Sequence, residues 1–377
     1  MQEQKQTVAK PNSAHIKTSR DVIRAINSFI KDNDELTKRY HKTRRLARVL
    51  RHGAVYDMTS RCNLWCEGCY FFEGEGQSQI IEEMSIKKWE EHFSGQSASG
   101  VTFGYFGGAE PGLVQDRVII ASEHIPFGTM ATNGTLKIDP SIPYRLIVSV
   151  WGDEELTTKL RGGNTFWKAI RNFEGDDRAL FAYTISNQNL KDVRAVAKVC
   201  RDHGIKLTFN MYSPTTSYLQ KLEVNHVNDK EFFRVSTADN NLCFTDAQLE
   251  NTRDEIDILI DDFPDTIVYP HAYNKEICAT GPVFDISEDD GLALNCAGRH
   301  NGTHSTYLSN LEVSDKKCCT PEVSCDGCRQ NAPYLPSRLQ PKTTDVENIE
   351  SFTDWLEICE YWAWFYINHQ AERIVSK

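Results

Sequence analysis

The chain has 377 residues, of which 40% are hydrophobic and 25% charged, with a formal net charge of −11. Such values are ordinary for a soluble globular protein, and this length allows two hydrophobic cores. The longest apolar runs are only strand-sized, which excludes a membrane-spanning helix, and the acidic balance disfavours a protein that coats nucleic acid. Residues 1–10 lack the apolar core of a signal peptide, so we expect a cytoplasmic protein whose 12 cysteines bind metal rather than form disulfides.

The first segment, residues 1–51, is basic and helical in character. It holds 13 Lys and Arg residues against five Asp and Glu residues. Apolar residues are spaced to form one face of a helix at Val22, Ile23, Ile26, Phe29 and Ile30. We interpret the basic charges as a solvated helical face, and a contact with nucleic acid is the alternative.

Residues 52–265 alternate short β-rich runs with longer helical patterns. The predicted strands are Ala54–Thr59, Val101–Phe106, Gly128–Thr132, Leu146–Val150, Leu180–Ile185 and Leu207–Met211. Helical patterns are clearest at Ser85–Phe93, Thr165–Phe173 and Asn189–His203, and Gly204 stands where the last of these helices should end. Six βα repeats predict a parallel sheet with helices outside it, either doubly wound or a partial barrel.

Residues 266–377 form a third part that is rich in Cys, Gly and Asp and poor in regular pattern. A small region of this composition cannot be held together by apolar burial alone, so we expect it to need metal. The aromatic run Trp355–Phe365 near the end predicts a helix that packs on the rest of the fold.

Three cysteines, Cys62, Cys66 and Cys69, follow the first predicted strand and are separated by three and then two residues. Parallel α/β folds place their chemistry at this end of the strands. Three thiolates from one short loop suit an iron–sulfur cluster, zinc or a disulfide framework. A closed zinc site needs four ligands, and no fourth Cys or His lies beside this trio. On a four-iron cluster, three ligands would leave one iron open.

Polar motifs also stand at the ends of the next three strands. Gly107-Gly108-Ala109-Glu110-Pro111 follows the second strand, where small residues allow close approach of a ligand and a carboxylate can accept hydrogen bonds from an ammonium group. Asn133 lies in a Thr-Asn-Gly turn after the third strand, and Ser149 lies near the end of the fourth. Arg161 follows in an Arg-Gly-Gly stretch, and its guanidinium could bind a carboxylate through two hydrogen bonds.

The order of these motifs resembles the radical S-adenosylmethionine (radical SAM) superfamily over roughly residues 52–212. The resemblance implies that Cys62, Cys66 and Cys69 hold a [4Fe–4S] cluster whose open iron is chelated by the amino and carboxylate groups of SAM. It also implies that SAM is bound by residues of the later motifs, namely Gly108, Ala109, Glu110, Pro111, Asn133, Ser149 and Arg161.

The chain departs from that family at three positions. Ala109 replaces the second glycine of the Gly-Gly-Glu-Pro motif, which should cost little unless this position needs a positive φ. Trp151 stands where an aspartate is common. Gly68 stands where an aromatic residue usually precedes the third cysteine, so we expect Tyr70, or a phenylalanine just after it, to cover the adenine of SAM.

The C-terminal cysteines form a second constellation. Cys278 and Cys296 flank a predicted β-hairpin with its turn at 289–291, so we expect the hairpin to bring them close together. With a later Cys-x-x-Cys, this pattern resembles the SPASM and Twitch extensions of radical SAM enzymes. The resemblance implies an auxiliary [4Fe–4S] cluster on Cys278, Cys296, Cys325 and Cys328, and a second cluster would also recruit Cys318 or Cys319, and Cys359. A zinc ribbon on the same four cysteines is the alternative.

These features predict a radical SAM enzyme with a partial (β/α)6 TIM-like barrel and a small cysteine-rich C-terminal extension. The resemblance implies reductive cleavage of SAM to a 5′-deoxyadenosyl radical, with a reductase, flavodoxin or ferredoxin as electron donor. The radical would abstract hydrogen for an oxidation or a bond formation. We expect a small-molecule substrate such as a sugar, an aminocyclitol, a nucleotide or a lipid precursor. A peptide or protein side chain, a nucleic-acid base, and a non-enzymatic zinc-stabilised interaction module are the alternatives.

Overall fold

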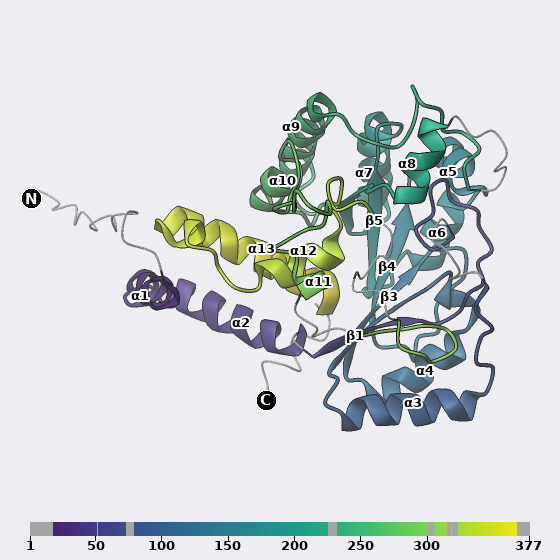
Figure 1. The fold of residues 1–377 in the computed structure, drawn as a ribbon, viewed down its shortest axis with the longest axis horizontal. Helices are drawn as coiled ribbons and strands as arrows, with labels where there is room; N and C mark the ends of the chain where they lie inside the picture. The colour runs from purple at the N-terminus through teal and green to yellow at the C-terminus, as the bar shows by residue number, and fades with distance from the viewer. Residues whose placement is uncertain are drawn as a thin grey trace, which may run out of the picture.

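The computed structural model describes residues 18–50, 52–72, 79–224, 232–300, 305–314, 318 and 323–367. Its centre is a seven-stranded sheet in the order β6-β5-β4-β3-β2-β1-β7, with every neighbouring pair parallel (Figure 1). The strands are β1 (Gly53–Asp57), β2 (Phe103–Gly107), β3 (Phe127–Thr132), β4 (Arg145–Val150), β5 (Ala179–Ile185), β6 (Leu207–Met211) and β7 (Ser305–Tyr307). The first six coincide with the predicted strands apart from shifts at their ends, and β7 is an addition that the sequence did not reveal.

Helices connect the strands of the parallel sheet, except that the described residues between β3 and β4 form no helix. They are α3 (Ile86–Ala98), α4 (Gln115–His124), α5 (Glu154–Arg161), α6 (Phe166–Phe173), α7 (Val193–Asp202), α8 (Thr216–Glu223) and α9 (Asp246–Asp262), with short 3₁₀ turns at Pro111–Leu113 and Leu190–Asp192. Figure 1 shows α3, α4 and α6 on one side of the sheet and the C-terminal helices on the other. Gly204 follows α7 with a φ of 65°, which is the left-handed conformation expected of a helix-ending glycine.

The C-terminal region carries α10 (His271–Ile277), α11 (Ala297–His300), α12 (Asn331–Arg338), a 3₁₀ turn at Thr344–Val346, and α13 (Ile349–Ile367). The long helix α13 covers the ends of the strands opposite the cysteine loop. The Thr129 hydroxyl donates to the Tyr366 carbonyl over 2.7 Å, and the hydroxyls of Thr208 and Tyr361 share a 2.9 Å hydrogen bond. The predicted packing of the aromatic run on the barrel is therefore what the structure has.

Residues after 265 also complete both edges of the sheet. On one edge β7 pairs with β1, and on the other Ile267 forms a parallel bridge to Leu207. One continuous hydrophobic core contains barrel residues together with Val323 and Trp362. The segments that we separated at residue 265 therefore share a core. The C-terminal region covers the strand ends opposite the cysteine loop with α13 and pairs with both edges of the sheet.

The basic N-terminal segment forms two helices, α1 (Ser19–Ile30) and α2 (Asp34–Leu50). Thr18 caps α1 through a reciprocal capping box with Asp21. Apolar side chains of both helices pack on α13, where Ile26 and Leu36 share a core with Trp355. The remaining face is charged and exposed, as the solvated-face interpretation predicted.

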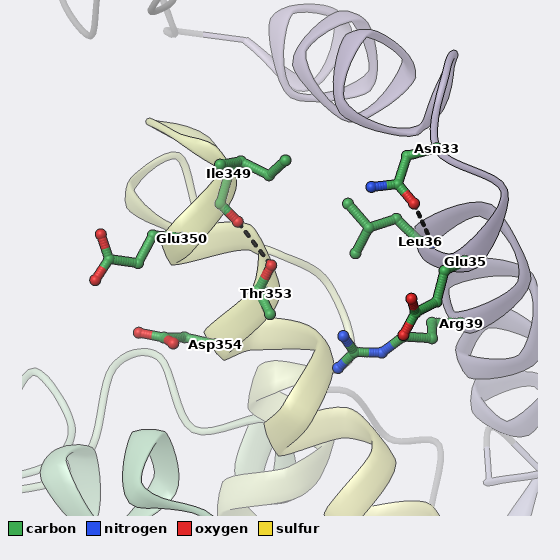
Figure 2. A pocket seen from close by; sticks show the side chains of 8 residues that line it. All are labelled: Asn33, Glu35, Leu36, Arg39, Ile349, Glu350, Thr353 and Asp354. Atoms are coloured by element: carbon green, nitrogen blue, oxygen red, sulfur yellow. Dashed lines mark hydrogen bonds between the residues drawn. The ribbon is translucent and has the colours of Figure 1, made fainter.

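A shallow groove of about 400 Å³ separates α2 from α13 (Figure 2). Its walls carry both signs of charge, from Glu35 and Arg39 on α2 and from Asp354 on α13. Arg39 is held by a bidentate pair of 2.9 Å hydrogen bonds to Glu360, so this cation of the basic segment serves helix packing. Among the described residues, no helix is long and apolar enough to cross a membrane.

Candidate active site

A cavity of about 810 Å³ opens at the carboxyl ends of β1 to β6. Most of the residues that the sequence singled out for the SAM site line this one cavity: Cys62, Cys66, Cys69, Tyr70, Gly108, Ala109, Glu110, Asn133, Ser149 and Arg161. Pro111 does not line it. Instead Pro111 is buried behind the turn, at the start of the 3₁₀ helix that Glu110 caps.

The Cys66 thiol lies close enough to Cys62 and Cys69 to influence the pKa of both. Burial raises the pKa of Cys62, and it raises the pKa of Cys69 to about 12. In both cases the neighbouring Cys66 thiol raises the pKa further. Metal binding deprotonates thiols outright, so iron would relieve this mutual repulsion of thiolates, and the donor set suits an iron–sulfur cluster. Within the described residues, no group of three or more His, Cys, Asp or Glu side chains is arranged so that it could hold a metal ion as it stands.

Glu82 fixes the chain that leads into the cysteine loop. Its carboxylate accepts hydrogen bonds from the Thr59 hydroxyl over 2.7 Å and from the Ser60 backbone N–H over 2.9 Å. Arg117, almost fully buried, adds an ion pair at 3.0 Å. Burial works against ionisation of Glu82, but these hydrogen bonds outweigh it and lower its pKa to about 2.

Glu67 anchors the loop between its second and third cysteines. It is fully buried and accepts hydrogen bonds from the backbone N–H groups of Arg234, at 2.9 Å, and Ser236, at 3.0 Å. The loop backbone is held as well, because the Gly68 N–H donates to the Phe232 carbonyl over 2.7 Å. A carboxylate inside the cysteine motif thus serves to position the loop.

The structure explains why a glycine precedes the third cysteine. Gly68 has a φ of +56°, and a Cβ atom there would lie 2.1 Å from the Tyr212 hydroxyl oxygen. That hydroxyl donates to the Gly68 carbonyl over 3.2 Å. Tyr212 therefore occupies the space that an aromatic side chain at position 68 would need, and the next aromatic residue, Tyr70, stacks on it with ring centroids 5.8 Å apart.

Tyr70 forms part of the cavity wall as predicted. Its hydroxyl accepts a 3.0 Å hydrogen bond from the Ser213 backbone N–H, which fixes the ring. Trp151, the residue that replaces the common aspartate, also lines the cavity and contacts Tyr212 edge-on at 6.1 Å. Three aromatic rings thus form one wall beside the cysteines.

The turn after β2 approaches the cysteine loop through its backbone. Gly108 has a φ of +97°, and a Cβ atom there would lie 3.0 Å from both the Met58 nitrogen and the Thr59 oxygen. Ala109 has no such φ, and its N–H donates to the Thr59 carbonyl over 3.0 Å. The position that needs glycine is therefore 108, and alanine at 109 fits without strain.

Glu110 is buried, with 1% of its surface exposed, and holds the turn together. Its carboxylate accepts hydrogen bonds from the Gly112 N–H at 2.8 Å, the Thr132 hydroxyl at 2.8 Å and the Asn133 N–H at 2.7 Å. Burial raises its pKa, while these bonds and the nearby Arg161 oppose that rise. A carboxylate has about four acceptor sites, so capacity for a cavity-side donor remains.

Asn133 ties the end of β3 to the cysteine loop. Its amide donates to the Asn63 side-chain oxygen over 2.7 Å and contacts the Cys62 sulfur at 3.7 Å. Its own oxygen accepts from the Thr135 N–H over 2.9 Å. The Thr-Asn-Gly turn therefore orients the first cysteine as well as lining the cavity.

Arg161 is a buried cation without a carboxylate partner among the described residues, although 3% of its surface is exposed to the cavity side. Its guanidinium donates to the carbonyls of Asn133 and Ser149, and its Nε has no partner there. A buried guanidinium is costly unless an anion satisfies it, and the fork geometry suits a carboxylate. The arrangement can bind an anionic group close to the cysteines.

Comparison with known proteins agrees with this architecture. No protein-family model matches the chain. It is similar to Fe-coproporphyrin III synthase of Methanosarcina barkeri, with 29% identity over 170 residues, which are 40% of this chain and 41% of the relative. Streptococcus suis SuiB bound to precursor peptide SuiA superposes with a TM-score of 0.50 at 16% identity, covering 76% of this chain and 64% of SuiB. SuiB bound to S-adenosylmethionine gives 0.49 at 17% identity, covering 71% and 60%.

The chain thus spans about two fifths of the length of the curated relative and less than two thirds of SuiB. At such identities the likeness concerns the fold. The chain shares the fold of SuiB. The α/β partial TIM-like barrel expected from the sequence is therefore confirmed.

Four C-terminal cysteines lie within electrostatic reach of one another, and one of them, Cys318, lines the same cavity as the cysteine loop. Burial raises the pKa of Cys328 to about 12, and the nearby thiols that raise it further are Cys318, Cys296 and Cys325. A hairpin in which Tyr307 bridges Val313 separates Cys296 from Cys318 along the chain. This hairpin contains β7. Cys296 precedes it and Cys318 follows it, and the two thiols lie near enough to influence each other.

The predicted hairpin also exists, with a bridge between Ile286 and Ala293. Cys278 follows α10, where its thiol donates to Asn274 over 3.4 Å. Burial raises its pKa to about 12, and the nearby Arg329 opposes that rise. The expected pairing of Cys278 with Cys296 stays a prediction.

Cys359 is buried elsewhere, in the core that α13 shares with α1 and α2. Cys319 lies outside the described residues. Of the residues that form the site, sequence reasoning missed Glu67, Glu82 and Asp57. Glu67 could have been noticed for its place inside the cysteine motif, whereas Glu82 follows no motif and acts only through tertiary contacts.

Replacing Gly68 by alanine should disrupt the cysteine loop, because the new methyl group meets the Tyr212 hydroxyl and the residue must keep a positive φ. We expect a loss of stability of more than about 1 kcal/mol and reduced iron incorporation. Thermal unfolding and iron assays measure both. Gly175→Ala, with a φ of +78° and open space around it, controls for the backbone cost alone. Equal losses in the two variants would contradict the proposed clash.

Replacing Glu82 by alanine should leave the buried Arg117 without its counter-ion and release residues 59 and 60. Breaking a buried pair typically costs about 3–5 kcal/mol, so we expect a loss of this size in chemical unfolding, with less iron bound. Glu83→Ala is the matched control, because Glu83 forms an exposed ion pair with Lys88 and should matter little. Similar unfolding curves for the two variants would show that Glu82 does not anchor the loop.

Proposed function

We propose that this chain is a radical SAM enzyme that binds a [4Fe–4S] cluster on Cys62, Cys66 and Cys69 and binds SAM in the adjoining cavity. The observation that carries the proposal is the convergence of three thiols, a buried carboxylate and an unpaired buried guanidinium on one cavity. SAM is an amino acid derivative with an ammonium and a carboxylate group. Arg161 suits the carboxylate, and the remaining acceptor capacity of Glu110 suits the ammonium.

The cluster and SAM together would supply a 5′-deoxyadenosyl radical that removes a hydrogen atom from the substrate. The residues of the chain have the task of binding and orienting the reactants and excluding water. Glu82, Glu67 and Asn133 hold the cysteine loop against the strand ends. The aromatic wall of Tyr70 and Trp151 offers flat surfaces beside the cysteines, where an adenine ring could stack.

We propose a small molecule as the substrate. The cavity volume of about 810 Å³ lies within the range of small-ligand sites, roughly 300–1,000 Å³, and SAM must share it. Helix α13 lines the lower end of the cavity with Phe365 and Tyr366, which limits its depth. The similar Fe-coproporphyrin III synthase is named for a small-molecule product.

Modification of a peptide is the second candidate. It is favoured by SuiB, which shares the fold and whose structure is with a precursor peptide. A peptide would have to insert a single side chain into the cavity. A one-electron donor such as a flavodoxin or ferredoxin would be the partner in either case. We place base modification in nucleic acid lower, because Arg39 of the basic segment is paired with Glu360.

We further propose that the C-terminal region holds an auxiliary [4Fe–4S] cluster on Cys296, Cys318, Cys325 and Cys328. Support comes from the grouping of these four thiols around Cys328. Arg299 adds a charged donor, 3.7 Å from the Cys325 sulfur, which suits a cluster bearing negative charge. Cys278, bonded to Asn274, stays a thiol in this proposal, and so does Cys359.

Replacing Cys62, Cys66 and Cys69 together by alanine should abolish reductive cleavage of SAM under dithionite while auxiliary iron remains bound.

In a separate variant, Arg161→Leu should weaken SAM binding by roughly 1.5–3 kcal/mol, the range for hydrogen bonds to charged groups. Formation of 5′-deoxyadenosine and spectral titration with SAM measure the two effects. Cleavage of SAM by the triple variant would refute the proposed role of the loop.

Cys318→Ser and Cys278→Ser are a matched pair that tests the auxiliary ligands. We expect the first variant to lose about four irons per chain after anaerobic reconstitution, and the second to keep wild-type iron content, because only Cys318 lies among the other thiols. Iron and sulfide assays with EPR spectroscopy distinguish them. The reverse pattern would restore Cys278 to the ligand set, and zinc in place of iron would identify a zinc ribbon.

A further inference from the structure

Asp57 is a carboxylate in the cavity wall that the protein leaves without a partner. It ends β1, five residues before Cys62, and lines the same cavity. Among the described residues, no hydrogen-bond donor and no cation reaches its carboxylate. Burial alone raises its pKa to about 7. Asp57 is half-buried and faces the cavity, so a carboxylate without a protein partner at this place points to a ligand group that satisfies it.

The other carboxylates of the site are occupied differently. Glu67 and Glu82 accept hydrogen bonds from the backbone and side chains that they hold in place. Glu110 accepts three hydrogen bonds from the turns after β2 and β3. Among the described residues that line this cavity, Glu110 and Asp57 carry carboxylates. Glu110 is occupied by the protein, whereas the acceptor sites of Asp57 remain available to a ligand.

A second acceptor without a partner belongs to Asn210 on β6, a residue that lines the cavity. The side-chain oxygen of Asn210 is buried and has no hydrogen-bond partner among the described residues. Asn210 pairs in register with Thr184 on β5, which also lines the cavity. An amide oxygen left unsatisfied in a buried wall costs free energy as well, and this second observation is independent of Asp57.

The two acceptors differ in kind from the SAM side of the cavity. Arg161 there is a donor, and it suits an anion. The lining of the cavity also contains apolar residues, among them Ile147 and Phe365, and further polar ones, among them Arg299 and Thr306. A ligand beyond the SAM site therefore meets two acceptors within a lining of mixed polarity.

Building on the proposed function, we propose that Asp57 and Asn210 bind the substrate by accepting hydrogen bonds from its hydroxyl or amino groups. The substrate class is then a small molecule rich in donors, such as a polyol, an amino sugar or an aminocyclitol.

The first test asks whether Asp57 stays open once SAM is bound. Anaerobically reconstituted full-length enzyme is treated with a carbodiimide and glycinamide, and mass spectrometry measures the labelling of each carboxyl group. We expect SAM to change the labelling of Asp57 by less than about twofold, and Asp57→Asn to keep wild-type SAM affinity. Protection by SAM of about tenfold or more would put Asp57 in the SAM site and overturn the proposal. The exposed Asp289 serves as the labelling control.

The second test uses two matched probes on the SAM-saturated enzyme. Myo-inositol offers hydroxyl donors, and its fully O-methylated ether has the same ring without any donor. We expect myo-inositol to slow the labelling of Asp57 and the ether not to do so. Asn210→Leu, which keeps the side-chain size but removes the acceptor, should weaken that protection while Asp57 still labels. Equal effects of the two probes would overturn the proposal. Formation of 5′-deoxyadenosine by the wild-type enzyme tests the proposed function separately.

Discussion

The site depends on the close backbone contact between the turn after β2 and the chain that leaves β1. Gly108 allows this contact, because a side chain there would come within 3.0 Å of the Met58 nitrogen and the Thr59 oxygen. The Ala109 and Glu110 N–H groups then donate to the carbonyls of Thr59 and Arg61, each over 3.0 Å. These bonds set the start of the cysteine loop directly beside the buried carboxylate of Glu110. A shift of one residue in this turn would separate the two halves of the SAM site.

The charged side chains around this contact fall into two groups, those that the protein satisfies and those that it leaves open. Glu82 and Glu67 are saturated by the loop that they hold, and this rigidity keeps three thiols near one another although burial opposes their ionisation. Arg161 and Asp57 are the opposite case, since each is left with hydrogen-bonding capacity inside the cavity. Saturated groups therefore build the site, while unsatisfied groups of opposite charge mark where ligands are proposed to bind.

Much of the fold, and the gathering of the proposed SAM-site residues in one cavity, could be predicted from the sequence. Strands β1 to β6 are short apolar runs between helical patterns, and parallel pairing forces their carboxyl ends to one edge, so the motifs at those ends meet in one cavity. Local spacing sufficed for Cys62, Cys66 and Cys69, because they share one loop. For Cys278 local spacing leaves the ligand set open, because this residue lies at the end of α10 and its possible partners are distant in sequence. Asp57 and Glu82 carry no motif, and their roles depend on burial and on partners distant in sequence.

The central claim is that the cysteine loop holds a cluster with one open iron that binds SAM. Mössbauer spectroscopy of the wild-type enzyme reconstituted with ⁵⁷Fe tests it most directly. With one site-differentiated cluster and one auxiliary cluster, one iron of about eight per chain should change its isomer shift when SAM is added. A spectrum in which SAM alters no iron would contradict the account.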